Sequence, residues 1–239
     1  MNDRSMRRFR FLAAFGVLFL TVWFLWNTPF VYPVKLFVVL LHEISHGLAT
    51  LATGGEIVAI EITPLEGGLC RCPGGNAFLT LSAGYLGSLL WGGLMIWGAE
   101  RFPAFSSWLA AAVAVIVGTS TVLFVQQPFA TTFGLAFAAA LLAVAWRAGA
   151  SVNRVVLTML GLTSCLYAVL DIKSDILDRP ELASDARMLA EMTGVPTLLW
   201  GGAWISVALL FCIFLFRWAW RRRLTAGGYG SRSSHSSGS

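Results

Sequence analysis

The sequence LHEISHG at residues 41–47 lies inside an apolar run that extends over residues 31–52. An apolar run of this length predicts a membrane-spanning helix. Residues four apart on a helix project about 40° from each other, so His42 and His46 share one face. Two imidazoles placed in this way can bind one metal ion, and Glu43 between them can reach a water molecule on that metal. The stretch therefore predicts a metal site inside a membrane helix.

The apolar surroundings of Glu43 strengthen this interpretation. Glu43 is the only acidic residue between Asp3 and Glu56. A charged side chain at bilayer depth costs at least roughly 2.5–3.5 kcal/mol, so an ionisable group there indicates a functional site. The chain has three histidines, and the third, His235, lies in a polar tail. Chance is a poor explanation for two histidines at ligand spacing around an intramembrane glutamate.

The composition excludes a soluble protein. Of the 239 residues, 57% are hydrophobic and 12% are charged, and the mean hydropathy is +0.73. Because the apolar residues are spread along the whole chain, we expect an all-α, polytopic integral membrane protein. The net charge of +5 comes mainly from short arginine clusters at the two ends. Such clusters mark membrane topology and give no support to nucleic-acid binding.

The apolar segments set the expected number of crossings. There are seven, at residues 11–26, 31–52, 77–99, 107–125, 129–146, 155–170 and 197–216. Arginine-rich flanks place both termini in the cytoplasm, which requires an even number of crossings. We therefore expect six or seven transmembrane helices in a plasma-membrane protein whose N-terminus is cytoplasmic. Residues 1–225 would form one membrane domain, and the Gly/Ser-rich residues 226–239 a disordered tail.

The periodicity changes after the metal-bearing helix. Apolar residues alternate with smaller or more polar ones over residues 58–62, which is typical of a strand. Pro64 ends this strand, the glycines at 67–68 offer a turn, and residues 69–73 can return as a second strand. The alternative is an irregular interfacial loop. A hairpin beside the metal could hold an extended substrate by strand addition.

The four cysteines do not form a disulfide framework. Cys70 and Cys72 are separated by one residue, which is too close for an ordinary disulfide or a standard zinc knuckle. Their role is left open. Cys165 and Cys212 lie in apolar segments, where we expect them to pack in the core.

A face of small residues is predicted on the segment at residues 77–99. Gly84, Ser88 and Gly92 recur every four residues, and such a face lets another helix approach closely. The metal-bearing helix is one possible neighbour, although general helix packing also explains the pattern.

A catalytic zinc site needs a third protein ligand besides the two histidines, and an open position for water. Asp171 directly follows an apolar segment, and Asp175 is four residues further on, so the two share a helix face. We prefer Asp171 as the third ligand, with Asp175 as the second choice. The alternative is a solvated helix end in which these acids pair with Lys173 and Arg179.

Taken together, these motifs resemble the site-2 protease superfamily of intramembrane zinc metallopeptidases, and in particular its short peptidase-like branch in bacteria, plants and fungi. The matching segments are HEISH (42–46), TGG (53–55), PLEGG (64–68), AGYLGS (83–88) and a pattern over 184–200 that begins SDA and contains TGVP. The resemblance covers most of residues 33–205, with a core at 31–100 and 150–205.

The resemblance implies a zinc-dependent endopeptidase that cuts membrane-embedded peptide substrates, with one zinc ion. His42 and His46 would be metal ligands, and Glu43 the general base. Classical members supply the third ligand from a Leu-Asp-Gly motif. In this chain Asp171 is followed by isoleucine, and Asp185 is a further candidate for the third ligand.

Two other classes of function remain open. One is a catalytically inactive family member that binds the transmembrane helix of a partner. The other is a membrane metal-binding or transport protein, which usually carries polar residues in several spans. Residues 102–146 contain no acidic or basic side chain, so metal transport ranks below the other two. The sequence does not identify the substrate or the oligomeric state.

Overall fold

The computed structural model describes residues 28–178 and 183–225, together with scattered residues between 6 and 26. Seven of the sixteen residues of the predicted span at 11–26 therefore lie outside the described residues, and the tail at 226–239 lies wholly outside them.

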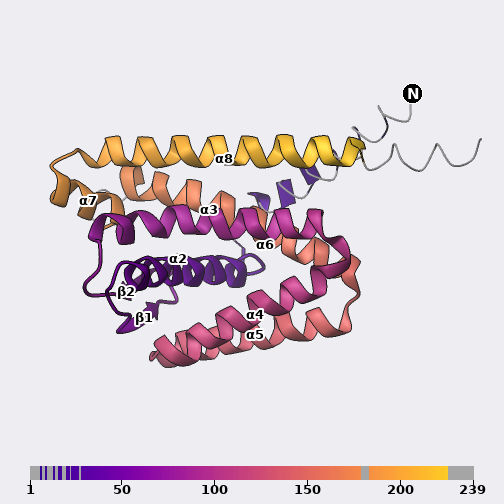
Figure 1. Ribbon diagram of the computed structural model, residues 1–239, viewed down its shortest axis with the longest axis horizontal. Helices are drawn as coiled ribbons and strands as arrows, with labels where there is room; N and C mark the ends of the chain where they lie inside the picture. Colours follow the sequence, from indigo (N-terminus) through magenta and orange to yellow (C-terminus); the bar gives the residue numbers. More distant parts are fainter. Residues whose placement is uncertain are drawn as a thin grey trace, which may run out of the picture.

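The described residues confirm an all-α membrane architecture (Figure 1). Six helices are long and apolar enough to cross a membrane, namely α2, α3, α4, α5, α6 and α8. In chain order the helical elements are α2 (Tyr32–Ala52), α3 (Ala77–Arg101), the 3-10 turn η1 (Pro103–Phe105), α4 (Ser106–Phe124), α5 (Pro128–Arg147), α6 (Ala150–Lys173), the π-helical turn η2 (Ser174–Asp178), α7 (Asp185–Thr193) and α8 (Thr197–Thr225).

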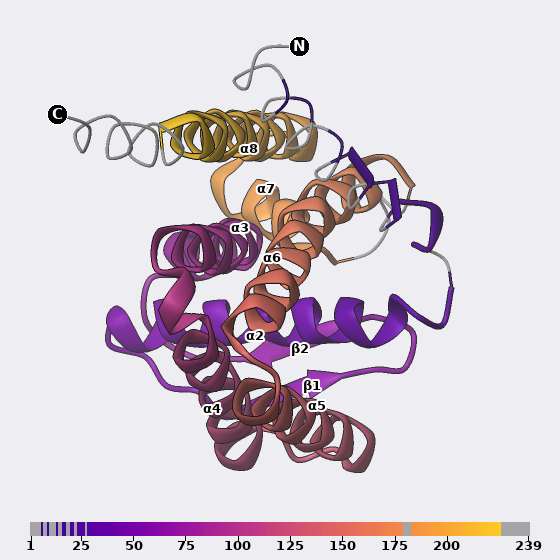
Figure 2. The same cartoon turned by 90° about the vertical axis from the view of Figure 1, so that its right-hand side faces the viewer.

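Helix α2 is the central element. It packs on α3 and α6 on one side and on the β-hairpin on the other, while α4 and α5 pair beyond the hairpin (Figure 2). Helix α8 lies against α3 and α6 on the far side of the bundle. Of the six candidate spans, α2 has the most buried apolar segment. The helix that carries the ionisable motif is thus the one most shielded by protein.

The ends of α2 follow local sequence signals. Pro33 stands in the first turn, where its missing N–H leaves no helical hydrogen bond unmade. The helix ends at Ala52 with Thr53 as its C-cap, and Gly54 follows with a φ of 90°. The N–H of Gly55 donates to the carbonyl of Thr50 at 2.9 Å and satisfies one of the last helical carbonyls.

Residues after α2 form the β-hairpin, which settles the choice between a hairpin and a loop. Strand β1 (Ala59–Ile62) pairs antiparallel with β2 (Gly68–Arg71), with Ile60 opposite Cys70. The outer edge of β1 makes a bridge to Val125 in the α4–α5 connection. At the tip, Lys35 of α2 pairs with Glu66 at 2.7 Å. The hairpin is therefore fixed against α2 at its tip and against α4–α5 along β1.

The expectation for the cysteine pair was wrong. Cys70 and Cys72 form a disulfide, and their Cα atoms are 5.5 Å apart. In an extended strand, residues two apart point to the same face, and this Cα separation lies in the usual range for disulfides. The sequence argument considered distance along the chain and overlooked the strand geometry. Cys165 is buried and Cys212 half-buried, as core packing predicts.

The small-residue face of α3 serves two neighbours. Around Gly92 it contacts α6, because an added Cβ would lie 2.6 Å from the carbonyl oxygen of Gly161. One turn earlier, the hydroxyl of Ser164 on α6 donates to the carbonyl of Ser88 at 2.7 Å. Another turn earlier, Gly84 faces α2. The same stripe therefore brings α6 and α2 close to α3.

We expect Gly92→Ala to destabilise the bundle by about 1–3 kcal/mol, because its methyl group would overpack against a backbone carbonyl of α6. Thermal unfolding in detergent measures the effect. The matched control is Gly118→Ala on α4, whose added Cβ would meet Ala138 at an ordinary 3.5 Å. Equal melting temperatures for the two variants would contradict the proposed close α3–α6 contact.

Candidate metal centre

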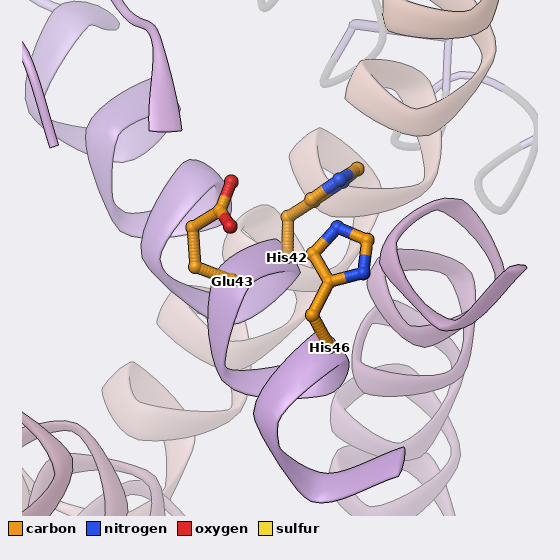
Figure 3. A group of neighbouring side chains, drawn as sticks. All are labelled: His42, Glu43 and His46. Atoms are coloured by element: carbon orange, nitrogen blue, oxygen red, sulfur yellow. The ribbon is translucent and has the colours of Figure 1, made fainter. Parts of the chain in front are cut away.

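The predicted motif lies midway along α2, and all three of its ionisable side chains are buried. Figure 3 shows the two imidazoles side by side, with the Glu43 carboxylate next to them. The ring centroids of His42 and His46 are 4.7 Å apart. One candidate ligand atom from each of the three residues lies within 4.8 Å of the others. The helix thus brings together the residues that the His-Glu-x-x-His spacing predicted.

Hydrogen bonding orients the ring of His46. Its Nδ1 atom lies 2.7 Å from the backbone carbonyl oxygen of Thr80 on α3. A carbonyl can only accept, so Nδ1 carries a proton, and Nε2 is the atom that would offer its lone pair to a metal. This is the arrangement in which metal-binding histidines are usually held.

The Nε2 atoms of both histidines face one carboxylate. Oδ2 of Asp185 lies 3.1 Å from Nε2 of His42 and 3.3 Å from Nε2 of His46. Burial alone would raise the pKa of Asp185, but the imidazoles of His46 and His42 hold this pKa well below its usual range. Asp185 is therefore ionised, as a metal ligand must be.

Helix α7 delivers Asp185 to the site from outside the candidate spans. Asp185 is the first residue of α7, and Ser184 caps the helix by accepting a hydrogen bond from the N–H of Arg187 at 3.3 Å. Ala186 and Leu189 are buried and fix α7 to the bundle. Only the family resemblance had suggested Asp185, because nothing local in the sequence marks this residue as close to α2.

The other two candidate aspartates lie in the same region but in different places. Oδ2 of Asp171, at the end of α6, is 3.9 Å from Nδ1 of His42. Asp175, in η2, accepts a 2.6 Å hydrogen bond from the hydroxyl of Tyr85. Tyr85 in turn packs edge-on against His42, with ring centroids 5.4 Å apart. Asp171 thus faces Nδ1 of His42, whereas Asp185 faces Nε2 of the same ring. Asp175 contacts Tyr85, and Tyr85 contacts His42.

The atoms around the two Nε2 positions suit zinc. With bonds of about 2.0–2.1 Å, neighbouring ligand atoms in a tetrahedral zinc site are about 3.3–3.4 Å apart. The observed separations from Asp185 Oδ2 to the two imidazoles are 3.1 and 3.3 Å. Two imidazoles and one carboxylate also form a ligand set typical of catalytic zinc. The residues present therefore fit this metal.

Two glycines make room for the site, and sequence reasoning assigned neither of them to it. A Cβ on Gly84 of α3 would collide with Nε2 of His42 and lie 2.6 Å from Cε1 of His46. A Cβ on Gly68 of β2 would lie 2.8 Å from Cδ of Glu43. Both glycines belong to segments that carry the family resemblance, and this was the only signal in the sequence for their role.

Strand β2 also contacts the predicted catalytic base. Gly68 has so little space next to Glu43 that the backbone of β2 lies directly against this carboxylate. Glu43 therefore lies between α2 and the hairpin, while the two imidazoles lie between α2 and α3. The predicted general base and the predicted metal ligands therefore face adjoining spaces.

Comparison with known proteins gives one family. A model described as peptidase M50B-like matches residues 15–215. The comparisons with curated proteins and with solved structures gave no match.

We expect Gly84→Ala to weaken zinc binding by roughly ten-fold or more, because the added methyl group displaces the imidazoles that it would touch. Competition with a chromophoric chelator measures the affinity. Gly202→Ala on α8, where an added Cβ meets nothing within 4 Å, is the control. Unchanged zinc affinity in Gly84→Ala would show that this glycine does not shape the site.

Proposed function

Because this chain belongs to the peptidase M50B-like family, we propose that it is a zinc-dependent endopeptidase that hydrolyses peptide bonds of membrane-embedded substrates. Family membership supports a membrane metallopeptidase, and six candidate spans support substrates that reach it within the bilayer. The observation that carries the proposal is the convergence of His42, His46 and Asp185 on one point.

The third zinc ligand in this proposal is Asp185. Among the carboxylates of the described residues, only its Oδ2 atom forms a contact with the Nε2 atoms of both histidines, and its distances to them suit a tetrahedral site. Asp171 lies at Nδ1 of His42, where a carboxylate can orient a metal-bound imidazole without touching the metal. The sequence favoured Asp171 as the ligand, and that assignment stays a prediction.

Zinc bound at this site would supply Lewis-acid activation of a water molecule and polarisation of the scissile carbonyl. Glu43 would take the proton from the attacking water and pass it to the departing amine. The buried position of Glu43 beside the imidazoles keeps bulk water away from this transfer. Thr80 would hold His46 in the tautomer that the reaction needs.

The hairpin supports an extended substrate. The N–H of Thr63 donates to the carbonyl of Gly67 at 2.8 Å, and hydrogen-bonded pairs alternate with unbonded pairs along an antiparallel ladder. The backbone groups of Gly68 and Cys70 therefore point away from β1. Gly68 lies directly against the Glu43 carboxylate, so β2 borders the site. A peptide added along the edge would pass beside the general base with its peptide bonds unshielded.

We expect Glu43→Gln to keep stoichiometric zinc and to lose at least about 10²-fold in cleavage rate, because the amide preserves the shape of the side chain but cannot take a proton. Elemental analysis of purified protein and cleavage of a membrane peptide in liposomes provide the two measurements. If purified wild-type protein contained no stoichiometric zinc, the proposal that the chain is a zinc enzyme would be refuted. Full function in the Glu43→Gln variant would instead support a binding protein.

The choice of third ligand can be tested separately. We expect Asp185→Ala to lose stoichiometric zinc, because one of three protein ligands is removed. Asp171→Asn should retain zinc with an affinity about 10–100-fold lower, as is typical when an outer partner of a ligand is changed. Glu191→Gln, an exposed change on α7, is the control. The opposite ranking of the two aspartates would assign the ligand role to Asp171.

A further inference from the structure

The two histidines of the candidate metal centre differ in what fixes their rings. Nδ1 of His46 is bonded to the carbonyl of Thr80 at 2.7 Å, which sets the plane of that imidazole. Nδ1 of His42 lies 3.9 Å from Oδ2 of Asp171, and this separation is too long for a hydrogen bond. The other nitrogen of His42, Nε2, faces Asp185 and the metal position. Among the described residues, no hydrogen bond at Nδ1 therefore fixes the ring of His42.

The ring of His42 lies against the side chain of Tyr85 on α3. The two ring centroids are 5.4 Å apart and the ring planes meet at 83°, which is an edge-to-face arrangement. The ring of His46 also contacts His42, with centroids 4.7 Å apart and planes at 70°. In a closely packed interior, rotation of the His42 ring would have to displace one of these two rings. Packing thus restrains His42 where hydrogen bonding restrains His46.

The hydroxyl of Tyr85 holds the phenol ring in turn. Tyr85 is 1% exposed and is the largest fully buried side chain among the described residues. A buried hydroxyl costs stability unless it is hydrogen-bonded, and phenylalanine would fill nearly the same volume without that cost. The hydroxyl donates to Oδ2 of Asp175 at 2.6 Å, a length within the range for a hydrogen bond to a carboxylate. Tyr85 is therefore fixed at its hydroxyl by Asp175 and contacts His42 with its ring.

The acceptor of this hydrogen bond lies in an irregular helical turn. Asp175 belongs to η2, the π-helical turn that continues α6. Such turns are rare and are found frequently at functional sites. Asp171, four residues earlier, is the residue that lies beside Nδ1 of His42. The end of α6 thus approaches His42 on one route directly and on a second route through Tyr85.

Tyr85 also packs on the helix that carries the third candidate ligand. Its ring centroid lies 6.0 Å from that of Trp204 on α8. It shares a buried apolar cluster with Ala186 and Leu189, which fix α7 to the bundle. Asp185 is the first residue of this short helix. A movement of the phenol ring would therefore disturb an imidazole and the seat of α7 together.

We propose that Tyr85 is a positioning residue for His42. The hydrogen bond to Asp175 holds the phenol ring, and the phenol ring holds the imidazole at the angle that directs Nε2 toward Asp185. In this role Asp175 acts through Tyr85 and does not touch the metal. The inference rests on the proposed zinc peptidase, because it concerns the geometry of the metal ligands.

The test measures the zinc affinity of the purified full-length protein by competition with a chelator. We expect Tyr85→Phe and Asp175→Ala each to bind zinc about ten-fold more weakly, as is usual when an outer partner of a ligand is changed. The double variant should be no more than about two-fold weaker than either single variant, because the two groups act as one unit. Asp175→Asn keeps an acceptor oxygen for the hydroxyl, so it should lose about three-fold or less.

The matched control is Tyr32→Phe. It removes a tyrosine hydroxyl that donates to the carbonyl of Pro64 at 2.8 Å, ten residues before His42 on the same helix. Its zinc affinity should equal that of the wild type. Two further readouts separate positioning from folding. The melting temperature of the metal-free protein reports a merely structural role, whereas the visible absorption of the cobalt-substituted protein reports the geometry of the ligands and should change in Tyr85→Phe.

Three results would overturn the proposal. The first is a Tyr85→Phe variant with a lowered melting temperature but the zinc affinity and cobalt spectrum of the wild type. The second is simple addition of the two losses in the double variant. The third is loss of zinc in Asp175→Asn, which would make Asp175 a ligand. Each of these leaves the peptidase proposal standing, whereas wild-type protein that binds no zinc would refute the peptidase and the inference together.

Discussion

The structure depends on polar partners for three ionisable side chains that one membrane helix holds away from water. His42, Glu43 and His46 are all buried in α2. In hydrocarbon, each would cost several kcal/mol without a partner. The imidazoles have partners on two other elements, the carboxylate of Asp185 on α7 and the carbonyl of Thr80 on α3, and the backbone of β2 lies against the Glu43 carboxylate at Gly68. The arrangement of α3, α7 and the hairpin around α2 follows from this requirement.

Close approach of backbones makes these contacts possible. Gly84 lets α3 lie directly on the imidazoles, and Gly68 lets β2 lie directly on the carboxylate. Larger residues would fill the volume that the metal and the base need. Small residues in membrane helices usually serve helix packing. Here Gly92 does so against α6, whereas Gly84 in the same stripe shapes the site.

The hairpin and α7 provide the two sides of the site that lie outside the candidate spans. The ion pair of Lys35 with Glu66 holds the tip of the hairpin along α2, and the buried Lys35 is paired with a half-buried Glu66. The capped N-terminus of α7 places Asp185 opposite both histidines. A site built in this way keeps the proposed metal ligands on helices and leaves β2 beside Glu43.

The sequence by itself determined the class of protein, the bounds of most spans, and the pair of histidines with Glu43. These features depend on hydropathy and on the 3.6-residue period of one helix, which are local properties. Only the tertiary structure decided how the aspartates are placed, because Asp185 lies 143 residues from His42 and no local pattern connects them. The tertiary structure also decided the disulfide between Cys70 and Cys72. Their spacing in the sequence had predicted that they are too close for an ordinary disulfide. Contacts between distant segments are fixed by packing, and packing cannot be read from the period of a single segment.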